Sequence, residues 1–301
     1  MMKRILFYVL FLGYFMTAFS QKAKVATVSG DTIYYAPDNI TREVAKQTAI
    51  SLAKINAIAR KFGTIIENND YYRILNADGE TTPYFVSITE SDVKGEWIET
   101  IEETVDPIHD ENGLWAFKAH VKGKVREIIS SGINLKAKLL SNGIEDENET
   151  SVFKHKSRLY LSFIAPCDGY LSVFLTDTEY NAYCLLPYSS QTNGIYPIKA
   201  NTNYVFFDKG SLRDSDRSFV KRVDPMMLVT NRDREVNFVY IVFSPNSYSK
   251  PIDIQSDEKP NWEHTNFPRH LDSKDFQKWL SKSRRLDLKM TILKKAILIT
   301  K

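Results

Sequence analysis

Apolar residues recur every three or four positions across residues 41–63, and this spacing predicts a helix. Thr41 stands before the repeat as a candidate N-cap, Ile40 is placed to pack on the first turn, and Gly63 follows as a helix terminator. A flank of alanines beside the apolar stripe indicates close packing on a sheet. The stripe consists of Val44, Thr48, Leu52, Ile55, Ala59 and Phe62, and the flank of Ala45, Ala49 and Ala53.

Four segments around this helix alternate apolar and polar residues with the period of a strand: residues 24–28, 32–35, 95–103 and 114–125. In the last segment Lys118 and His120 share one face, and the other face carries Trp115, Phe117, Ala119 and Val121. Residues 21–132 are therefore predicted to form an α+β domain with one helix on an antiparallel sheet.

From about residue 133 the helical pattern ends and short strands follow one another, which is typical of a β-sandwich. Asp168-Gly169 and Asn193-Gly194 are dipeptides of hairpin turns, and the acidic residues 143–150 indicate a loop. The expected strands cover residues 133–140, 158–165, 170–176, 182–187, 203–207, 226–229 and 235–243.

The last part of the chain has a different pattern. Residues 256–267 indicate an extended connection, after which Asp272 and Asp275 can cap a short helix. Its apolar stripe is Phe276, Trp279 and Leu280, and residues 290–300 are expected to return to the sandwich as a strand. The predicted fold class is α+β, with the helix-on-antiparallel-sheet domain followed by a β-sandwich domain in residues 133–301.

The first 20 residues have the pattern of a cleavable secretory signal peptide. Lys3 and Arg4 precede an apolar run at residues 5–19, and Ala18-Phe19-Ser20 places small residues at the positions that a signal peptidase reads. The run is about 15 residues long, shorter than the roughly 20 that a helix needs to cross a bilayer. We therefore expect an exported protein in the periplasm or on the outer surface; an uncleaved anchor is the alternative. No later segment is apolar enough to predict a membrane span.

Net charge and cysteine content argue against nucleic-acid binding, a disulfide framework and a zinc site. Loss of Lys3 and Arg4 with the signal peptide lowers the formal charge from +3 by two, to +1. A chain so near neutrality has no electrostatic attraction to nucleic acid. Cys167 and Cys184 are the only cysteines, too few for a disulfide framework and without a second ligand pair for zinc.

Strand parity argues against a bridge between these two cysteines. If residues 170–176 and 182–187 form a hairpin, Leu175 lies opposite Tyr183 and Val173 opposite Leu185. Cys184 then falls on the other face beside Phe174, while Cys167 lies in a turn beyond the strand. Parity therefore disfavours a disulfide between Cys167 and Cys184. Because turns can break parity, the disulfide stays an alternative.

Motifs that would carry catalysis are absent from the sequence. It contains no serine-hydrolase elbow, no zinc-protease motif and no phosphate-binding glycine loop. His264 and His270, with Glu263 and Asp272, form the one conceivable metal set, although a polar connector with surface histidines is the favoured interpretation. The acidic clusters lack the alternation of a calcium loop. The sequence predicts no catalytic residue, no metal and no cofactor, while a distant carboxylate pair for glycan cleavage stays open.

Tyrosines are concentrated between residues 170 and 204. Tyrosine offers a large contact area at low entropic cost and is enriched in recognition surfaces, but it is also a good strand residue. A core or sheet-surface role is favoured over a binding face on this basis. If there is a binding face, the candidate contact residues are Tyr180, Tyr183, Tyr188 and Tyr196.

These same segments carry a family resemblance. The chain resembles bacterial domain-of-unknown-function family 4384, whose members share an apolar strand, an Asp-Gly-Tyr turn and a Leu-Pro step. The segments that carry the resemblance are residues 159–163, Asp168-Gly169-Tyr170-Leu171, residues 183–188 and residues 204–207. Residues 45–49 and 62–66 are similar to the N-terminal half of exported Bacteroidetes proteins that carry this domain, and faintly to helix-on-sheet domains of outer-membrane and flagellar accessory lipoproteins. The resemblance covers most of the mature chain and implies an accessory role without catalytic residues.

We therefore expect a non-catalytic exported protein of the cell envelope that binds or scaffolds an unidentified envelope protein or glycan. The alternative, from a different functional class, is a hydrolase that acts on envelope glycans or peptides through a carboxylate pair. A cleft with two convergent carboxylates or a His-centred cluster would favour the hydrolase. An aromatic patch or an exposed strand edge would favour binding.

Overall fold

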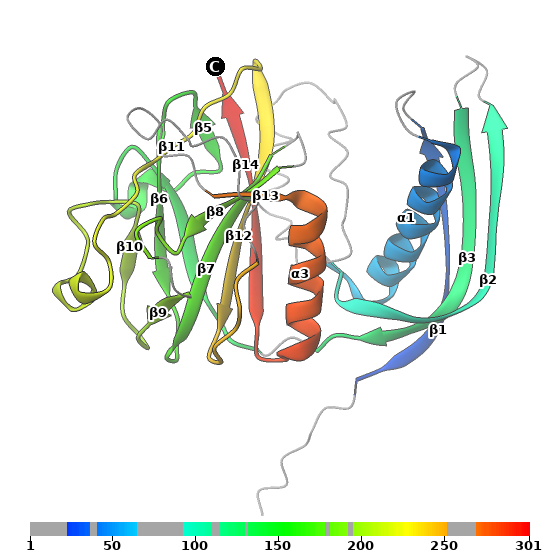
Figure 1. The fold of residues 1–301 in the computed structure, drawn as a ribbon, viewed down its shortest axis with the longest axis horizontal. Coiled ribbons are helices and arrows are strands. Elements are labelled where there is room, and N and C mark those ends of the chain that lie inside the picture. The colour runs from blue at the N-terminus through cyan, green and yellow to red at the C-terminus, as the bar shows by residue number, and fades with distance from the viewer. Residues whose placement is uncertain are drawn as a thin grey trace, which may run out of the picture.

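The computed structural model describes residues 23–36, 41–64, 93–109, 115–129, 132–177, 181–191, 195–251 and 269–301. The predicted signal peptide, the connection at residues 256–267 and the turn at Asn193-Gly194 lie outside these ranges. The fold is α+β, with a helix on an antiparallel sheet followed by a β-sandwich (Figure 1). Among the described residues, no helix is both long enough and apolar enough to cross a membrane.

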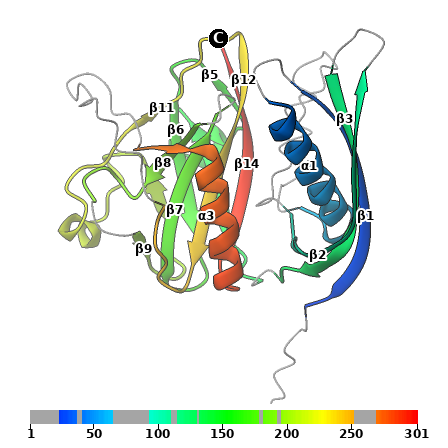
Figure 2. The same ribbon diagram turned by 45° about the vertical axis from the view of Figure 1, so that its right-hand side comes forward.

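The N-terminal part is a three-stranded antiparallel sheet of order β1-β3-β2, covered on one face by a helix (Figure 2). Its elements are β1 (Val25–Tyr35), α1 (Arg42–Phe62), β2 (Gly95–His109) and β3 (Trp115–Glu127). The two short strands predicted at residues 24–28 and 32–35 form the single strand β1, because it continues in register with β3 through Gly30 and Asp31.

Helix α1 begins and ends where its capping residues predict. The Thr41 side chain accepts a hydrogen bond from Val44 N, and Gly63 ends the helix with φ of 80°. Its buried face, however, is the predicted alanine flank rather than the larger apolar stripe. Val44 is exposed, whereas the buried residues are Ala45, Ala49, Ile50, Ala53, Ala57 and Ile58.

The close approach of helix and sheet explains this shift. Gly30 of β1 lies under α1, and a Cβ placed on Gly30 would meet Ala53 O at 2.2 Å and Ala57 Cβ at 2.8 Å. Such contact requires small residues on both elements, so the alanines face the sheet and larger side chains flank them. The other face of the sheet carries ion pairs between β3 and its neighbours: Lys122–Glu102, Lys124–Glu99, Arg126–Glu96 and His120–Asp31.

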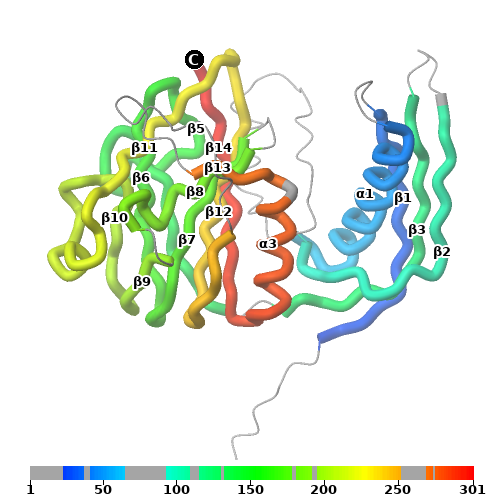
Figure 3. The backbone as a smooth tube through the Cα atoms, viewed as in Figure 1, coloured from blue at the N-terminus to red at the C-terminus, as the bar shows by residue number. Residues whose placement is uncertain are grey.

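The sandwich consists of a four-stranded and a seven-stranded sheet (Figures 1 and 3). The smaller sheet contains β4 (Lys136–Ser141), β6 (Arg158–Ile164), β10 (Tyr204–Phe206) and β11 (Met226–Met227). The larger has the order β13-β8-β7-β12-β14-β5, with β9 also paired to β7. Its strands are β5 (Val152–Lys154), β7 (Gly169–Thr176), β8 (Asn181–Leu186), β9 (Tyr196–Ile198), β12 (Arg234–Ser244), β13 (Arg269–Asp272) and β14 (Thr291–Thr300).

The two sheets enclose the largest core, and a helix forms a third layer. Leu161, Phe163, Val173, Ile241 and Phe243 belong to the core between the sheets. Helix α3 (Ser273–Leu286) packs on the outer face of the larger sheet through Phe276 and Leu280, which are fully buried as predicted. Trp279 is only partly buried. Asp272 caps α3 by accepting a hydrogen bond from Asp275 N.

The predicted hairpin between β7 and β8 is confirmed, with one correction to its register. Leu175 lies opposite Tyr183, and Phe174 opposite Cys184, as expected. Val173, however, pairs with Leu186 rather than Leu185, because a β-bulge shifts the register between Val173 and Phe174. Cys167 and Cys184 are both thiols. The predicted loop at residues 143–150 contains one short 3₁₀ turn, η2 (Asp146–Asn148).

Candidate functional site

The predicted tyrosine contact residues do not form one surface. Tyr188 and Tyr196 are 2% and 1% exposed, so these two candidates are core residues and offer no binding face. Tyr180 lies outside the described residues. Tyr183 is partly buried, on β8. Of the three candidates that the structure describes, Tyr183 is the one that lies near the surface.

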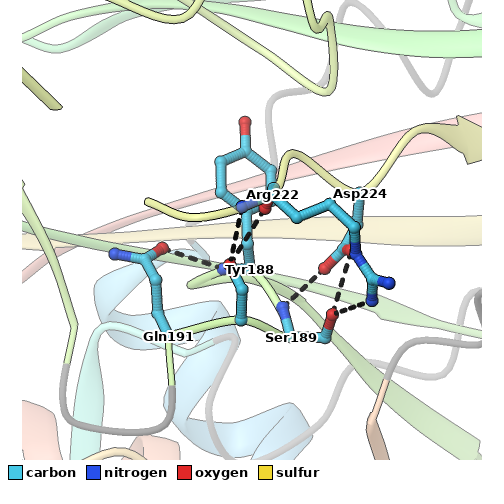
Figure 4. Close-up of polar contacts among 6 residues, drawn as sticks. Tyr188, Ser189, Gln191, Arg222 and Asp224 are labelled. Atoms are coloured by element: carbon cyan, nitrogen blue, oxygen red, sulfur yellow. Dashed lines mark hydrogen bonds and ion pairs between the residues drawn. The ribbon is translucent and has the colours of Figure 1, made fainter. Parts of the chain in front are cut away.

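Tyr188 begins a tight turn that is bonded to a distant segment (Figure 4). The turn follows the cis peptide bond Leu186-Pro187 and is closed by Tyr188 N donating to Gln191 Oε1 at 3.0 Å and Gln191 N donating to Tyr188 O at 2.8 Å. Ser189 then donates its N–H and its hydroxyl to the Asp224 carboxylate, the hydroxyl at 2.9 Å. The turn is thereby fixed to the connection between β10 and β11.

Arg222 completes this contact from the solvent side. Its Nη2 donates to Ser189 Oγ at 3.0 Å and its Nε lies 3.4 Å from Asp224 Oδ1. Ser190 Oγ donates to the Arg222 carbonyl oxygen at 3.0 Å. The buried Asp224 carboxylate is therefore paired with the Arg222 cation and accepts both hydrogen bonds from Ser189. These contacts indicate that Asp224 holds the turn in place rather than acting in catalysis.

The hydroxyls of the two buried tyrosines bind the same connection. Tyr188 Oη accepts a hydrogen bond from Phe207 N at 3.1 Å, and Tyr196 Oη donates to the buried Asp216 at 2.8 Å. Burial raises the pKa of both tyrosines, and for Tyr196 the hydrogen bond to Asp216 raises the pKa further. These tyrosines hold the connection on the sandwich, which favours the core interpretation for them.

Tyr183 belongs to a second polar cluster, at the edge where β8 pairs with β13. The register places His270 directly opposite Tyr183, and their ring centroids are 5.7 Å apart. Tyr183 Oη donates to Asp177 Oδ2 at 3.0 Å, and Asn181 Nδ2 donates to the same oxygen at 3.0 Å. We call Asp177, Asn181, Tyr183 and His270 the Tyr183–His270 patch.

Hydrogen bonds orient every member of this patch. Asn181 N donates to Asp177 Oδ1 at 2.9 Å, and His270 Nε2 lies 2.7 Å from Asn181 Oδ1. Because an amide oxygen only accepts hydrogen bonds, His270 Nε2 is the donor in this contact. The patch therefore presents two aromatic rings beside an amide and a carboxylate. Sequence reasoning missed it because β13 is four residues long and is defined only by its pairing with β8.

The conceivable metal set is not assembled by the described residues. His264 and Glu263 lie outside them, and Asp272 is engaged as the cap of α3. Within the ranges that the structure describes, no group of three or more His, Cys, Asp or Glu residues could hold a metal ion.

Comparison with known proteins adds no relative: no family model, no curated protein and no solved structure matches this chain. The resemblance to domain family 4384 thus stays a prediction.

Proposed function

We propose that this chain is a non-catalytic exported protein of the cell envelope that binds its partner through the Tyr183–His270 patch. The observation that carries the proposal is the pairing of Tyr183 with His270 on adjacent strands, next to the Asp177 carboxylate and the Asn181 amide. His270 is exposed and Tyr183 partly exposed, so the patch is accessible without opening the fold. A strand framework holds the patch in one geometry, which lowers the entropic cost of binding.

The chemistry of the patch fits an envelope glycan. Sugar hydroxyls both donate and accept hydrogen bonds, and an amide and a carboxylate supply complementary groups in fixed planes. The apolar face of a sugar ring can pack against the aromatic rings of Tyr183 and His270. A nucleic acid does not fit, because the patch holds a carboxylate and an amide rather than a set of lysines and arginines.

The two buried carboxylates of the sandwich support the non-catalytic side of the proposal. Asp216 accepts hydrogen bonds from Tyr196 and Ser215, and Asp224 from Ser189. A carboxylate pair for hydrolysis needs one acid and one base that reach the substrate. These two groups are instead engaged in holding the connection between β10 and β11.

Export rests on the signal-peptide pattern of residues 1–20. Mass spectrometry of the protein from its native host should give a chain that begins at Gln21. Recovery of the intact N-terminus in the cytosol would contradict export. Binding through the Tyr183–His270 patch is a separate claim with its own test.

The binding proposal is tested by co-sedimentation of the purified protein with insoluble envelope glycan, such as peptidoglycan. Tyr183→Ala and His270→Ala should each weaken binding at least about tenfold, because aromatic anchors often contribute about 2 kcal/mol. Tyr170→Ala, at a partly buried tyrosine of β7, is the matched control and should bind as the wild type does.

Three outcomes would overturn the proposal. Wild-type protein that does not sediment with glycan removes the proposed partner, and capture of an envelope protein instead would assign the patch to a different class of ligand. Unchanged binding in both patch variants would move the site elsewhere. Turnover of the glycan that Asp216→Asn or Asp224→Asn abolishes would establish the hydrolase alternative.

A further inference from the structure

The end of α3 and the turn that follows it expose two large apolar side chains, Leu286 and Leu288, two positions apart in the chain. Leu286 is 77% exposed and Leu288 is 62% exposed, the two highest values among the exposed large hydrophobic residues of the described chain. The turn lies at one end of the molecule, where α3 finishes and β14 starts (Figure 3). Two leucines left in water at a turn gain nothing for the fold, since their burial would stabilise it.

Asp287, between the two leucines, fixes the turn in this geometry. Its carboxylate accepts hydrogen bonds from the Ser244 hydroxyl, from Asn246 Nδ2 at 3.0 Å and from Lys289 N at 3.0 Å. Its backbone carbonyl accepts from Met290 N at 3.0 Å. The polar residue of the Leu-Asp-Leu sequence thus points into the protein, and both leucines are left on the solvent side.

Cationic residues flank the two leucines along the chain. Lys282 and Arg285 lie in the last turns of α3 and Lys289 begins the next segment, all three with exposed side chains. The one acidic group within the turn, Asp287, is engaged by the hydrogen bonds described above. The surface is therefore apolar at its tip and positively charged at its rim.

We propose that this turn docks on an anionic lipid surface, with Leu286 and Leu288 entering the headgroup boundary and Lys282, Arg285 and Lys289 contacting lipid phosphates. Protruding leucines with a cationic rim are the two features that together give reversible interfacial binding, whereas either alone is weak. The positive charges of the three cations are complementary to an anionic membrane, so we infer that the lipid surface is anionic. The inference is independent of the Tyr183–His270 patch, which lies where β8 pairs with β13 and contains none of these residues.

The test is co-sedimentation of the full chain with vesicles of phosphatidylglycerol and phosphatidylethanolamine, compared with vesicles of phosphatidylcholine alone. The anionic vesicles should bind the protein and the neutral ones should bind it at least about tenfold more weakly, since each surface cation adds roughly fivefold. Raising the salt concentration should reduce binding to the anionic vesicles, because salt screens the cationic rim.

Two variants separate the apolar from the ionic contribution. Leu286→Ala with Leu288→Ala should lower binding to anionic vesicles at least about tenfold, because the two changes together remove four methyl and two methine groups that would enter the headgroup boundary. Lys282→Gln with Lys289→Gln should lower it by a similar factor at low salt and have little effect at high salt.

A matched control uses the other exposed apolar pair of the C-terminal part. Met227 and Val229 are 56% and 54% exposed, and Met227→Ala with Val229→Ala should leave vesicle binding unchanged. Thermal melting of each variant checks folding, which exposed substitutions should hardly affect. Absence of wild-type binding to anionic vesicles would overturn the inference, and it is the result expected if the turn docked on a protein instead. Equal binding by the leucine variant would also overturn it.

Discussion

Arg284 of helix α3 donates a hydrogen bond from Nη1 to the carbonyl oxygen of Val93 at 3.1 Å, and both residues are buried. Val93 packs with Ile58 and Val125 in the N-terminal part of the fold. The contact therefore joins the helix-on-sheet part to the third layer of the sandwich across 191 residues of sequence. The predicted division into residues 21–132 and 133–301 has at least this one buried polar contact across it.

Arg284→Ala should destabilise the whole chain. The change leaves the Val93 carbonyl without this donor, and hydrogen bonds to charged groups contribute about 1.5–3 kcal/mol. The free energy of unfolding, measured by denaturant titration, should fall by about that amount. Arg285→Ala, at the exposed neighbouring arginine, is the control and should change it by less than about 0.5 kcal/mol. Equal effects of the two changes would show that the contact to Val93 contributes nothing.

Gly30→Ala should also destabilise the protein, by about 1–3 kcal/mol, because the added Cβ would overlap Ala53 O and Ala57 Cβ and force α1 away from β1. Ser29→Ala, on the exposed side of the same strand, should be nearly neutral. Thermal melting of the two variants distinguishes them. A Gly30→Ala protein that melts like the wild type would mean that the helix and sheet can separate at no cost.

Phe276→Ala should cost more stability than Trp279→Ala, although tryptophan is the larger residue. Phe276 is fully buried between Phe174 and Tyr240, with ring centroids at 4.8 Å and 5.2 Å, and truncation of such a residue costs about 3–5 kcal/mol. Trp279 is partly exposed and donates Nε1 to Ser249 O at 2.8 Å. Denaturant midpoints should follow this order, and the reverse order would contradict the burial of the helix.

Alkaline pH should unfold the protein through its buried tyrosines. Burial, and the hydrogen bond to Asp216, hold the pKa of Tyr196 above its usual range, while a tyrosine in the unfolded chain ionises near pH 10. This contribution to stability is fully present below about pH 10 and is lost as the pH rises further. Unfolding titrations at increasing pH should show this loss. Tyr196→Phe should make the loss shallower, and an unchanged dependence would exclude Tyr196 as a cause.

Features of the fold that depend on neighbouring residues in the sequence could be predicted, whereas features that depend on contacts between distant residues could not. Thr41 and Gly63 bound α1 correctly because capping depends on neighbouring residues alone. The alanine flank of α1 packs on the sheet as predicted, because Gly30 on a distant strand lies against it, whereas Val44 of the larger apolar stripe is exposed. Strands β5, β9 and β13, three or four residues long, were not predicted because only tertiary pairing defines them.

The candidate site was less predictable for the same reason. Tyr188 and Tyr196 stand in turn-rich sequence, which favours exposure, yet the connection between β10 and β11 folds over them and supplies hydrogen-bond partners. Tyr183 was identified as a candidate, but His270 was interpreted as a surface histidine of a polar connector or as a metal ligand, not as a partner of Tyr183. Nothing in the spacing of two residues 87 positions apart indicates that they face one another across a strand pair.

The position of β14 affects the order in which the protein can be completed. This strand comes last in the described chain, yet it lies inside the larger sheet between β12 and β5. A chain that emerges from a ribosome or a translocation pore delivers its N-terminal segments first. The helix-on-sheet part can therefore form early, while β12 presents an unpaired edge until residues beyond 290 have emerged. During that interval the β12 edge is open to pairing with another chain, and the arrival of β14 closes it.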